Sequence, residues 1–157
     1  MYSKPKQGCA PVPIAVHTLR VYASDMAVRA GFPSPADDAK VDRLDVSKLL
    51  VQHPQASFLL RASGVSMQDL GINDQDLLLV DRALTAQHGD IVVAEIDGEF
   101  TVKQLYHLHG QVKLLAGNKT YPASVPKEGQ NLSIFGVVTW AITAMHRAGY
   151  VRAGRCQ

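Results

Sequence analysis

The stretch GDIVVAEIDGEFTVKQLYHLHGQVKLLAGN, residues 89–118, decides the fold class of this chain. Two turn signals interrupt it, Asp97-Gly98 and His109-Gly110, and the segments around them are strand-like. Asp-Gly between such segments is a strong signal for a two-residue β-hairpin, and His-Gly is a weaker one. The stretch therefore predicts a meander of antiparallel strands.

Further strand-like segments lie on both sides of this meander. They are ASFLLRAS at 56–63, DLLLVDRAL at 76–84 and SIFGVVTWAITAMH at 133–146. Ahead of them, DRLDVSKLLVQH at 42–53 has apolar residues at 46, 49 and 50, a spacing that predicts a short helix. Short strands separated by turn residues are typical of all-β proteins. We expect a mainly β domain, either a bent sheet or a barrel, with at most short helices.

The region before this domain has the composition of a tail and a linker. Residues 1–13 contain three prolines, and residues 14–30 fit either a strand or a weak helix. FPSPADD at 32–38 cannot form regular structure, because proline removes amide donors and restricts the residue before it. The expected organisation is an N-terminal tail over 1–30, a linker over 31–41, a β domain over 42–146 and a C-terminal tail over 147–157.

Composition and charge exclude several classes of protein. The 157 residues are 46% hydrophobic, which is enough for one domain with its own core. The net charge is only +2, so there is no strong electrostatic case for nucleic-acid binding. Two cysteines, Cys9 and Cys156, without a C-x-x-C motif favour a reducing compartment. No signal peptide is visible, and the longest apolar stretch is too short for a bilayer, so we expect a cytoplasmic protein without a membrane anchor.

The first candidate for chemistry is Ser66 in SGVSM, residues 63–67. This serine follows an apolar strand, so its hydroxyl would lie at a strand end with backbone N–H groups nearby. Such N–H groups can stabilise an oxyanion. Ser-Gly pairs are most often simple loops, so the segment alone does not establish catalysis.

The second candidate is Lys103 in GEFTVKQL, residues 98–105. Strand alternation places Thr101, Lys103 and Leu105 on one face of the predicted strand. A lysine in the middle of a strand usually extends its amine to water. Here the neighbouring segments are apolar enough to form a core sheet, in which the amine would be partly desolvated.

A serine nucleophile needs a base, and histidine is the usual one. None of the six histidines stands in a recognisable triad context; they are His17, His53, His88, His107, His109 and His146. The His107–His109 pair has a spacing that can hold a metal, but no third ligand is evident, and surface imidazoles at a hairpin tip are the simpler interpretation. We therefore expect no metal and no cofactor, and a Ser66–Lys103 dyad is the sharper hypothesis.

The dyad requires that the pKa of Lys103 be far below its ordinary value. Free lysine has a pKa of about 10.4, and a base working near neutral pH requires a drop of about 3 units, or roughly 4 kcal/mol. Burial against apolar residues can lower a lysine pKa by this amount. The hypothesis thus predicts a buried Lys103 without a carboxylate partner, because a nearby carboxylate would keep the proton on the amine.

Taken in order, four motifs resemble those of the UmuD-like and LexA-like self-cleaving proteins. They are Ala-Gly before a proline-rich linker, SGVSM, GEFTVKQL, and IFGVVTWAI near the end, and together they span about residues 28–146. The resemblance implies a Ser-Lys autopeptidase on a LexA- and signal-peptidase-like β fold. By motif, Ser66 would be the nucleophile, Lys103 the general base, and Ala30-Gly31 the bond that is cut. The backbone amides around Ser66 would form the oxyanion hole.

The resemblance also indicates a branch of that family. Only 30 residues precede Gly31, and they contain no helix-turn-helix pattern, so the chain looks UmuD-like rather than LexA-like. Its Ala-Gly bond is similar to that of LexA and of plasmid-borne relatives such as MucA. This branch implies processing in the bacterial DNA-damage (SOS) response, stimulated by the RecA–single-stranded-DNA filament. The shortened protein would then work with a Y-family polymerase in error-prone translesion synthesis.

The resemblance further implies a homodimer, and FGVVTWAI at 135–142 offers apolar side chains that could pair across subunits or fill the domain's own core. Two other interpretations of the chain stay open at this point. One is a non-enzymatic polymerase-accessory or scaffold module with a vestigial dyad. The other is a signal-peptidase-like enzyme, against which the missing membrane anchor counts. Two further Arg-Ala-Gly triplets, at 147–149 and 152–154, lack the proline context and are interpreted as coincidence.

Overall fold

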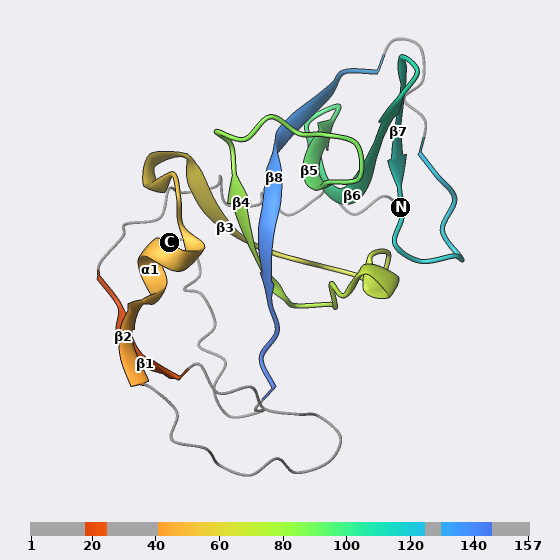
Figure 1. Cartoon of the computed structure of the whole chain (residues 1–157). Coiled ribbons are helices and arrows are strands. Elements are labelled where there is room, and N and C mark those ends of the chain that lie inside the picture. The colour runs from red at the N-terminus through yellow and green to blue at the C-terminus, as the bar shows by residue number, and fades with distance from the viewer. Residues whose placement is uncertain (1–17, 25–40, 125–129, 146–157) are drawn as a thin grey trace, which may run out of the picture.

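The computed structural model describes residues 18–24, 41–124 and 130–145 (Figure 1). The strands are β1 (Arg20–Ser24), β2 (Val41–Asp45), β3 (Ser57–Arg61), β4 (Leu77–Asp81), β5 (Ile91–Ile96), β6 (Glu99–Leu108), β7 (Gln111–Leu115) and β8 (Leu132–Ile142). The helical elements are one α-helix, α1 (Val46–Leu50), and two short 3₁₀ turns, Pro54–Ala56 and Gln68–Leu70. The prediction of a mainly β protein with only short helices is confirmed.

Six of the strands form one antiparallel sheet in the order β3-β4-β8-β5-β6-β7. The long strand β8 lies in the middle of the sheet and pairs with β4 and β5 (Figure 1). In the part of the chain that the structure describes, β3 and β7 do not pair with each other, so the sheet stays open. Of the two predicted architectures, the bent sheet is therefore correct and the closed barrel is not.

Both predicted hairpins are present. Asp97 and Gly98 join β5 to β6 with φ values of 50° and 86°, and His109 and Gly110 join β6 to β7 with φ values of 51° and 74°. Two successive residues with positive φ are typical of the type I′ turn, whose twist matches that of the flanking strands. The weaker His-Gly signal therefore predicted its turn as well as the Asp-Gly signal did.

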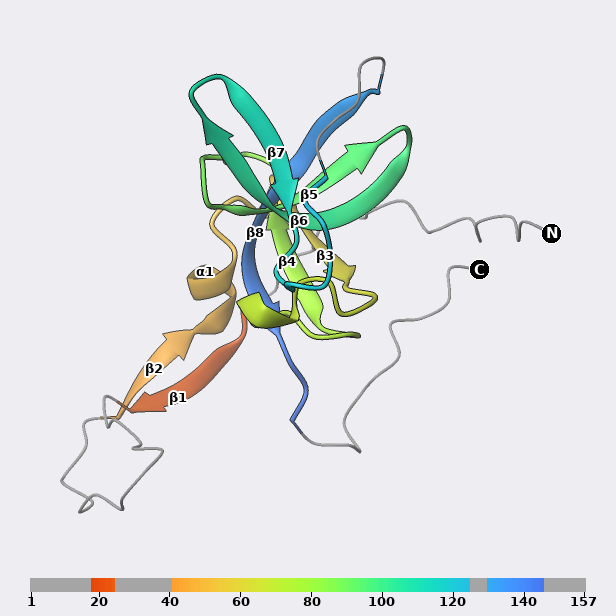
Figure 2. The same cartoon turned by 90° about the vertical axis from the view of Figure 1, so that its right-hand side faces the viewer.

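The sheet bends where β8 changes partners. The register of β8 shifts against β4 between Leu79 and Val80, and against β5 between Val93 and Ala94. Gly136 lies at this point, and a Cβ atom there would come within 2.8 Å of Val80 Cγ1. Irregularities of this kind bend a strand and increase its twist. As a result the β6–β7 hairpin turns away from the rest of the sheet (Figure 2).

Each face of the sheet carries its own hydrophobic core, and β5 contributes to both. Val93 belongs to one cluster, while Val92 and Ala94 belong to the other, as strand alternation requires. The buried members of the first cluster are Ala62, Met67, Ile72, Leu78, Val80 and Val93. Those of the second are Val92, Ala94, Leu105, Leu114 and Val137. Strand β6, which carries Lys103, pairs with β5 and contributes Val102 and Leu105 to the two clusters, so it lies next to both cores.

The helix predicted over 42–53 is present only over Val46–Leu50 and is wrong for residues 42–45 and 51–53. The structure has β2 at the first of these two stretches, paired with β1, and the helix begins only at Val46. Asp45 explains the boundary, because its side chain accepts hydrogen bonds from Ser47 N and Lys48 N and so caps a new helix. Residues 42–45 are extended because they pair with β1, and the sequence of 42–53 alone does not indicate that partner.

β1 and β2 form a separate two-stranded sheet that extends away from the six-stranded sheet (Figure 2). Strand rather than helix is therefore correct for residues 20–24 of the predicted N-terminal tail. The proposed boundaries of the tail, linker and domain otherwise remain predictions, because residues 1–17, 25–40 and 146–157 lie outside the described residues.

Candidate active site

Ser66 and Lys103, the two residues predicted to form a dyad, are in direct contact. Lys103 Nζ donates a hydrogen bond of 3.0 Å to Ser66 Oγ, across 37 residues of sequence. The contact is partly buried. A serine hydroxyl within hydrogen-bond reach of a basic side chain is the arrangement that nucleophilic catalysis requires.

Ser66 lies in the loop that follows β3. Gly64, which has a φ of 95°, turns the chain out of the strand, and its N–H donates to Asp74 Oδ1 at 2.8 Å. One residue after Ser66, the buried side chain of Met67 anchors the loop in the first core cluster. The serine is thus held between a fixed turn and a buried anchor, with its side chain half-buried.

Lys103 lies in the middle of β6, the strand that the meander motif predicted. Val92 of β5 is its direct partner in the register and is completely buried. Partial burial of Lys103 itself desolvates the amine and lowers its pKa. Within the described ranges, no carboxylate lies within ion-pair distance of the amine to oppose that shift. The shift has the direction that a lysine base needs, and among the described residues no acidic partner opposes it; the size of the shift that the dyad requires stays a prediction.

Two backbone amides next to the serine hydroxyl are available as donors. The N–H groups of Ser66 and Met67 donate no hydrogen bond to any residue that the structure describes, whereas Gln68 N donates to Val65 O at 3.3 Å. Unpaired N–H groups beside a nucleophile are suited to stabilise an oxyanion. The predicted oxyanion hole has donors available at Ser66 and Met67.

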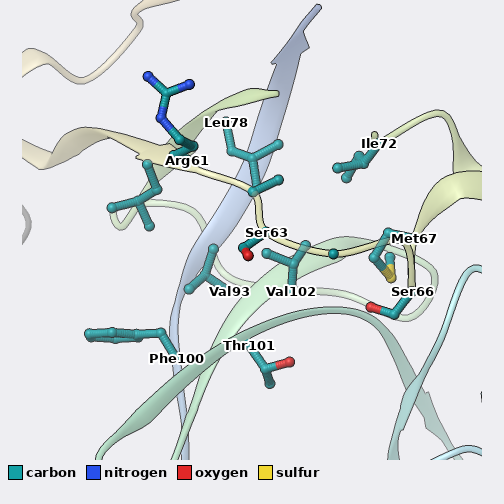
Figure 3. A pocket seen from close by; sticks show the side chains of 13 residues that line it. Arg61, Ser63, Ser66, Met67, Ile72, Leu78, Val93, Phe100, Thr101 and Val102 are labelled. Carbon is teal, nitrogen blue, oxygen red and sulfur yellow. The ribbon is translucent and has the colours of Figure 1, made fainter. Parts of the chain in front are cut away.

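Two neighbouring pockets open at the dyad. Ser66 lines a cavity of about 190 Å³ between the loop after β3 and strand β6 (Figure 3). Lys103 lines a second one of about 490 Å³. Phe100 and Thr101 line both pockets, so the two lie next to each other at β6.

Of the remaining predicted residues, the structure brings none that it describes into the dyad. Ala30 and Gly31 lie outside the described residues, as do His17 and His146. His107 ends up exposed on β6, whereas His109 belongs to the turn that follows, so the two do not share a strand face. Among the described residues, no group of three or more histidine, cysteine, aspartate or glutamate side chains is placed to hold a metal ion.

One histidine does pair with a carboxylate, away from the dyad. His53 Nδ1 lies 2.6 Å from Oδ2 of the buried Asp81. The nearby hydroxyl of Ser57 donates to the backbone carbonyl of His53 and not to its ring. These three residues therefore do not form a Ser-His-Asp triad, and none of them lines the pockets at Ser66 and Lys103.

Sequence reasoning missed the residues that hold the serine loop from the other side. Asn118 Nδ2 donates to Val65 O at 3.0 Å, and Asp69 N donates to Gly117 O at 2.7 Å. The available signal was the turn-forming composition of AGNKT directly after the strand β7, since asparagine and threonine side chains often bond to nearby backbone. That signal indicates a turn but not its distant partner.

None of the helices in the described ranges combines the length and the apolar character that crossing a lipid bilayer would require.

The chain is similar to several known proteins over most of its length. Residues 21–139 match the family model described as Peptidase S24-like. Protein SamA of Salmonella typhimurium is 48% identical over 110 residues, which cover 70% of this chain and 76% of SamA. Protein MucA of Escherichia coli is 43% identical over 128 residues, which cover 81% of this chain and 86% of MucA. The LexA repressor of Photorhabdus laumondii is 40% identical over 116 residues, which cover 73% of this chain and 57% of the repressor.

These relatives confirm the resemblance that the ordered motifs predicted, with LexA the more distant of the three. The matched region includes both members of the dyad, all of β2, and β1 except for its first residue, Arg20. The chain belongs to the Peptidase S24-like family.

Proposed function

We propose that this protein is a self-cleaving serine peptidase that uses Ser66 as its nucleophile and Lys103 as its general base. The observation that carries the proposal is the 3.0 Å contact between Lys103 Nζ and Ser66 Oγ. In that contact, burial lowers the pKa of the lysine, so the neutral amine needed for proton transfer is more accessible than in a solvated lysine.

The chemistry follows from this geometry in three steps. Neutral Lys103 accepts the Ser66 hydroxyl proton as Oγ attacks the carbonyl carbon of Ala30, and the N–H groups of Ser66 and Met67 donate to the resulting oxyanion. The lysine ammonium then gives its proton to the amide nitrogen of Gly31, the C–N bond breaks, and residues 1–30 stay attached as an ester of Ser66. Finally, neutral Lys103 takes a proton from water as the water oxygen attacks the ester carbonyl, the acyl C–Oγ bond breaks, and the lysine ammonium returns the proton to Ser66 Oγ, which frees residues 1–30 with a carboxyl group at Ala30.

The assignment of Ala30-Gly31 as the scissile bond rests on the motif and on the chain path. The segment 25–40 that contains this bond connects β1 to β2, and both of these strands are held by pairing. Small residues on both sides of the bond suit close approach of the backbone to a nucleophile.

The biological setting proposed is the bacterial DNA-damage response, in the cytoplasm. There the RecA–single-stranded-DNA filament would stimulate self-cleavage, and the shortened homodimer would serve a Y-family polymerase in translesion synthesis. The support is the motif resemblance to UmuD-like proteins together with the similarity to MucA and to a LexA repressor.

Intact-mass measurement tests the peptidase directly. Purified protein is incubated at neutral and alkaline pH, with and without RecA filament, next to Ser66→Ala, Lys103→Ala and Gly31→Glu variants. The wild type should yield a 31–157 fragment, faster at alkaline pH and with filament, and the three variants should stay intact. A Ser66→Ala chain that is cut at the wild-type rate would refute the dyad. A wild-type chain that remains intact under all conditions would favour the non-enzymatic accessory module.

A further inference from the structure

Asn118 bonds to the residue directly before the nucleophile from a segment outside the nucleophile's loop. Its Nδ2 donates to Val65 O at 3.0 Å, across 53 residues of sequence. On its other side, Oδ1 accepts from Thr120 N at 3.0 Å and from Thr120 Oγ1 at 2.6 Å. Because the side-chain oxygen is committed to two donors of Thr120, the amide nitrogen is the atom that must face Val65.

Val65 O and the N–H of Ser66 belong to the same peptide unit. That unit is planar and trans, so its carbonyl and its N–H point in opposite directions. A bond that fixes the carbonyl therefore also fixes where the Ser66 N–H points. In the described part of the chain this N–H has no partner of its own that could orient it.

Two further contacts join the same segments. Gly117 N donates to Met67 Sδ at 3.3 Å, and Gly117 O accepts from Asp69 N at 2.7 Å. The segment with Gly117 and Asn118 directly follows β7, which pairs with the β6 strand that carries Lys103. Asn118 thus connects the loop of the nucleophile to the sheet that holds the base.

We propose that Asn118 is a positioning residue that aims the Ser66 N–H at the oxyanion formed during self-cleavage. This inference rests on the proposed function. Asn118 acts through the Val65–Ser66 peptide and has no hydrogen bond to Ser66 Oγ or Lys103 Nζ. Its loss should therefore weaken stabilisation of the transition state without changing the protonation of the base.

The expected kinetic signature is a lower plateau rate with an unchanged pH midpoint. Removing one oxyanion donor outright costs about 100- to 1000-fold in rate, and a misaimed donor should cost less. We expect Asn118→Ala to lower the plateau rate of self-cleavage about 10- to 100-fold. Thr120→Ala removes one of the two donors to Oδ1 and keeps the backbone N–H, so it holds the amide less firmly and should give a smaller fall of the same kind.

The experiment measures first-order self-cleavage of the full chain from pH 7 to pH 11, together with the thermal unfolding midpoint of each variant. Asn131→Ala is the control for the same substitution, because Asn131 is exposed and its side chain forms no hydrogen bond within the described ranges, whereas Asn118 is half-buried. It should cleave like the wild type. If Asn118→Ala does not fold, Thr120→Ala decides, since it removes an exposed hydroxyl and leaves the amide of Asn118 in place.

Three results would overturn the inference. The first is a wild-type plateau rate in the folded Asn118 and Thr120 variants. The second is a displaced pH midpoint, which would mean that Asn118 acts on Lys103. The third is an equal loss of cleavage rate in Asn131→Ala. Failure of the proposed function is recognised separately, because in that case the wild type itself would not cleave or Ser66→Ala would still do so.

Discussion

Val92 and Lys103 lie directly opposite each other in the pairing of β5 with β6, and the valine is completely buried. Residues opposite each other in an antiparallel pair project to the same face of a sheet. The lysine stem therefore shares a face with the second core cluster, whose buried members include Leu105 two residues further along β6. This placement explains why the pKa of Lys103 is lowered by desolvation.

The first prediction concerns the pH dependence of self-cleavage. Only the neutral amine of Lys103 can accept the serine proton, so the rate should rise with pH and level off once the lysine is deprotonated. Because burial lowers the pKa of Lys103, the midpoint of this rise should lie below the ordinary lysine value of about 10.4. The measurement is the first-order rate of fragment formation across the alkaline range.

Lys103→Arg is the control for this profile, because a guanidinium stays protonated throughout the range. It should not cleave at any pH tested. A wild-type rate that is independent of pH, or that falls as pH rises, would contradict the role of Lys103 as the base.

The second prediction is that Lys103→Met stabilises the fold near neutral pH. A charged lysine desolvated without a partner opposes folding, and methionine fills a similar volume without charge. Since the pKa is lower in the folded state than in the unfolded state, the unfolded chain binds more protons between these two pKa values, and stability rises with pH through that window. The advantage of methionine should therefore be largest below the folded-state pKa and shrink above it.

Thermal unfolding at several pH values measures this effect, with Ser66→Ala in both chains to prevent cleavage. Lys48→Met serves as the comparison, because Lys48 is exposed on α1 and its replacement should change stability by less than about 0.5 kcal/mol. An equal gain from both substitutions would show that burial of Lys103 is not the cause.

The third prediction concerns Gly136, where β8 changes partners. A Cβ there would lie 2.8 Å from Val80 Cγ1 and 2.9 Å from Asp81 O, and the backbone oxygen cannot move aside easily. Gly136→Ala should therefore destabilise the protein by about 1–3 kcal/mol. Urea unfolding measures the loss, and Ser133→Ala, at an exposed site on the same strand, should leave the transition midpoint close to that of the wild type.

The fourth prediction concerns the buried carboxylate of Asp81. Its two oxygens are satisfied by His53 Nδ1 at 2.6 Å and by Ala83 N at 2.8 Å. Asp81→Ala leaves these donors without their acceptor and should cost about 1–3 kcal/mol in the free energy of unfolding. The self-cleavage rate of the folded variant should stay near that of the wild type, because Asp81 lines neither pocket of the dyad. A selective loss of cleavage with normal stability would connect Asp81 to the chemistry instead.

The strands could be predicted because their signals are local, whereas the pairing of Ser66 with Lys103 has no local signal. Asp97-Gly98 specifies a hairpin by its own backbone preferences, and Lys103 was placed in a core strand by the apolar residues around it. The contact between Ser66 and Lys103 was inferred from what a serine needs, together with family motifs, and not from any pattern linking the two positions.

The features that were missed depend on partners distant in sequence. Residues 42–45 form a strand because residues 20–24 lie beside them, and nothing within 42–53 indicates that neighbour. Asn118 reaches Val65 across 53 residues, so its role could not be read from the turn in which it lies. The choice between an open sheet and a barrel likewise depends on whether β3 and β7 meet, which no single segment specifies.

Because β1 pairs with β2, cleavage of the chain between them and release of the N-terminal peptide would be two separate events. Five register pairs join these strands, and the bond proposed to be cut lies in the chain between them. Hydrolysis would remove the covalent connection while leaving the ladder of backbone hydrogen bonds intact, so the N-terminal peptide would at first remain as a bound product. A two-stranded sheet is only marginally stable in water, and only the bonds of Leu19 to Val46 and Ser47 are seen to add to its hold in the described residues, so that product should depart on its own. The edge of β2 would then become available when the N-terminal peptide leaves, and not when the bond is cut.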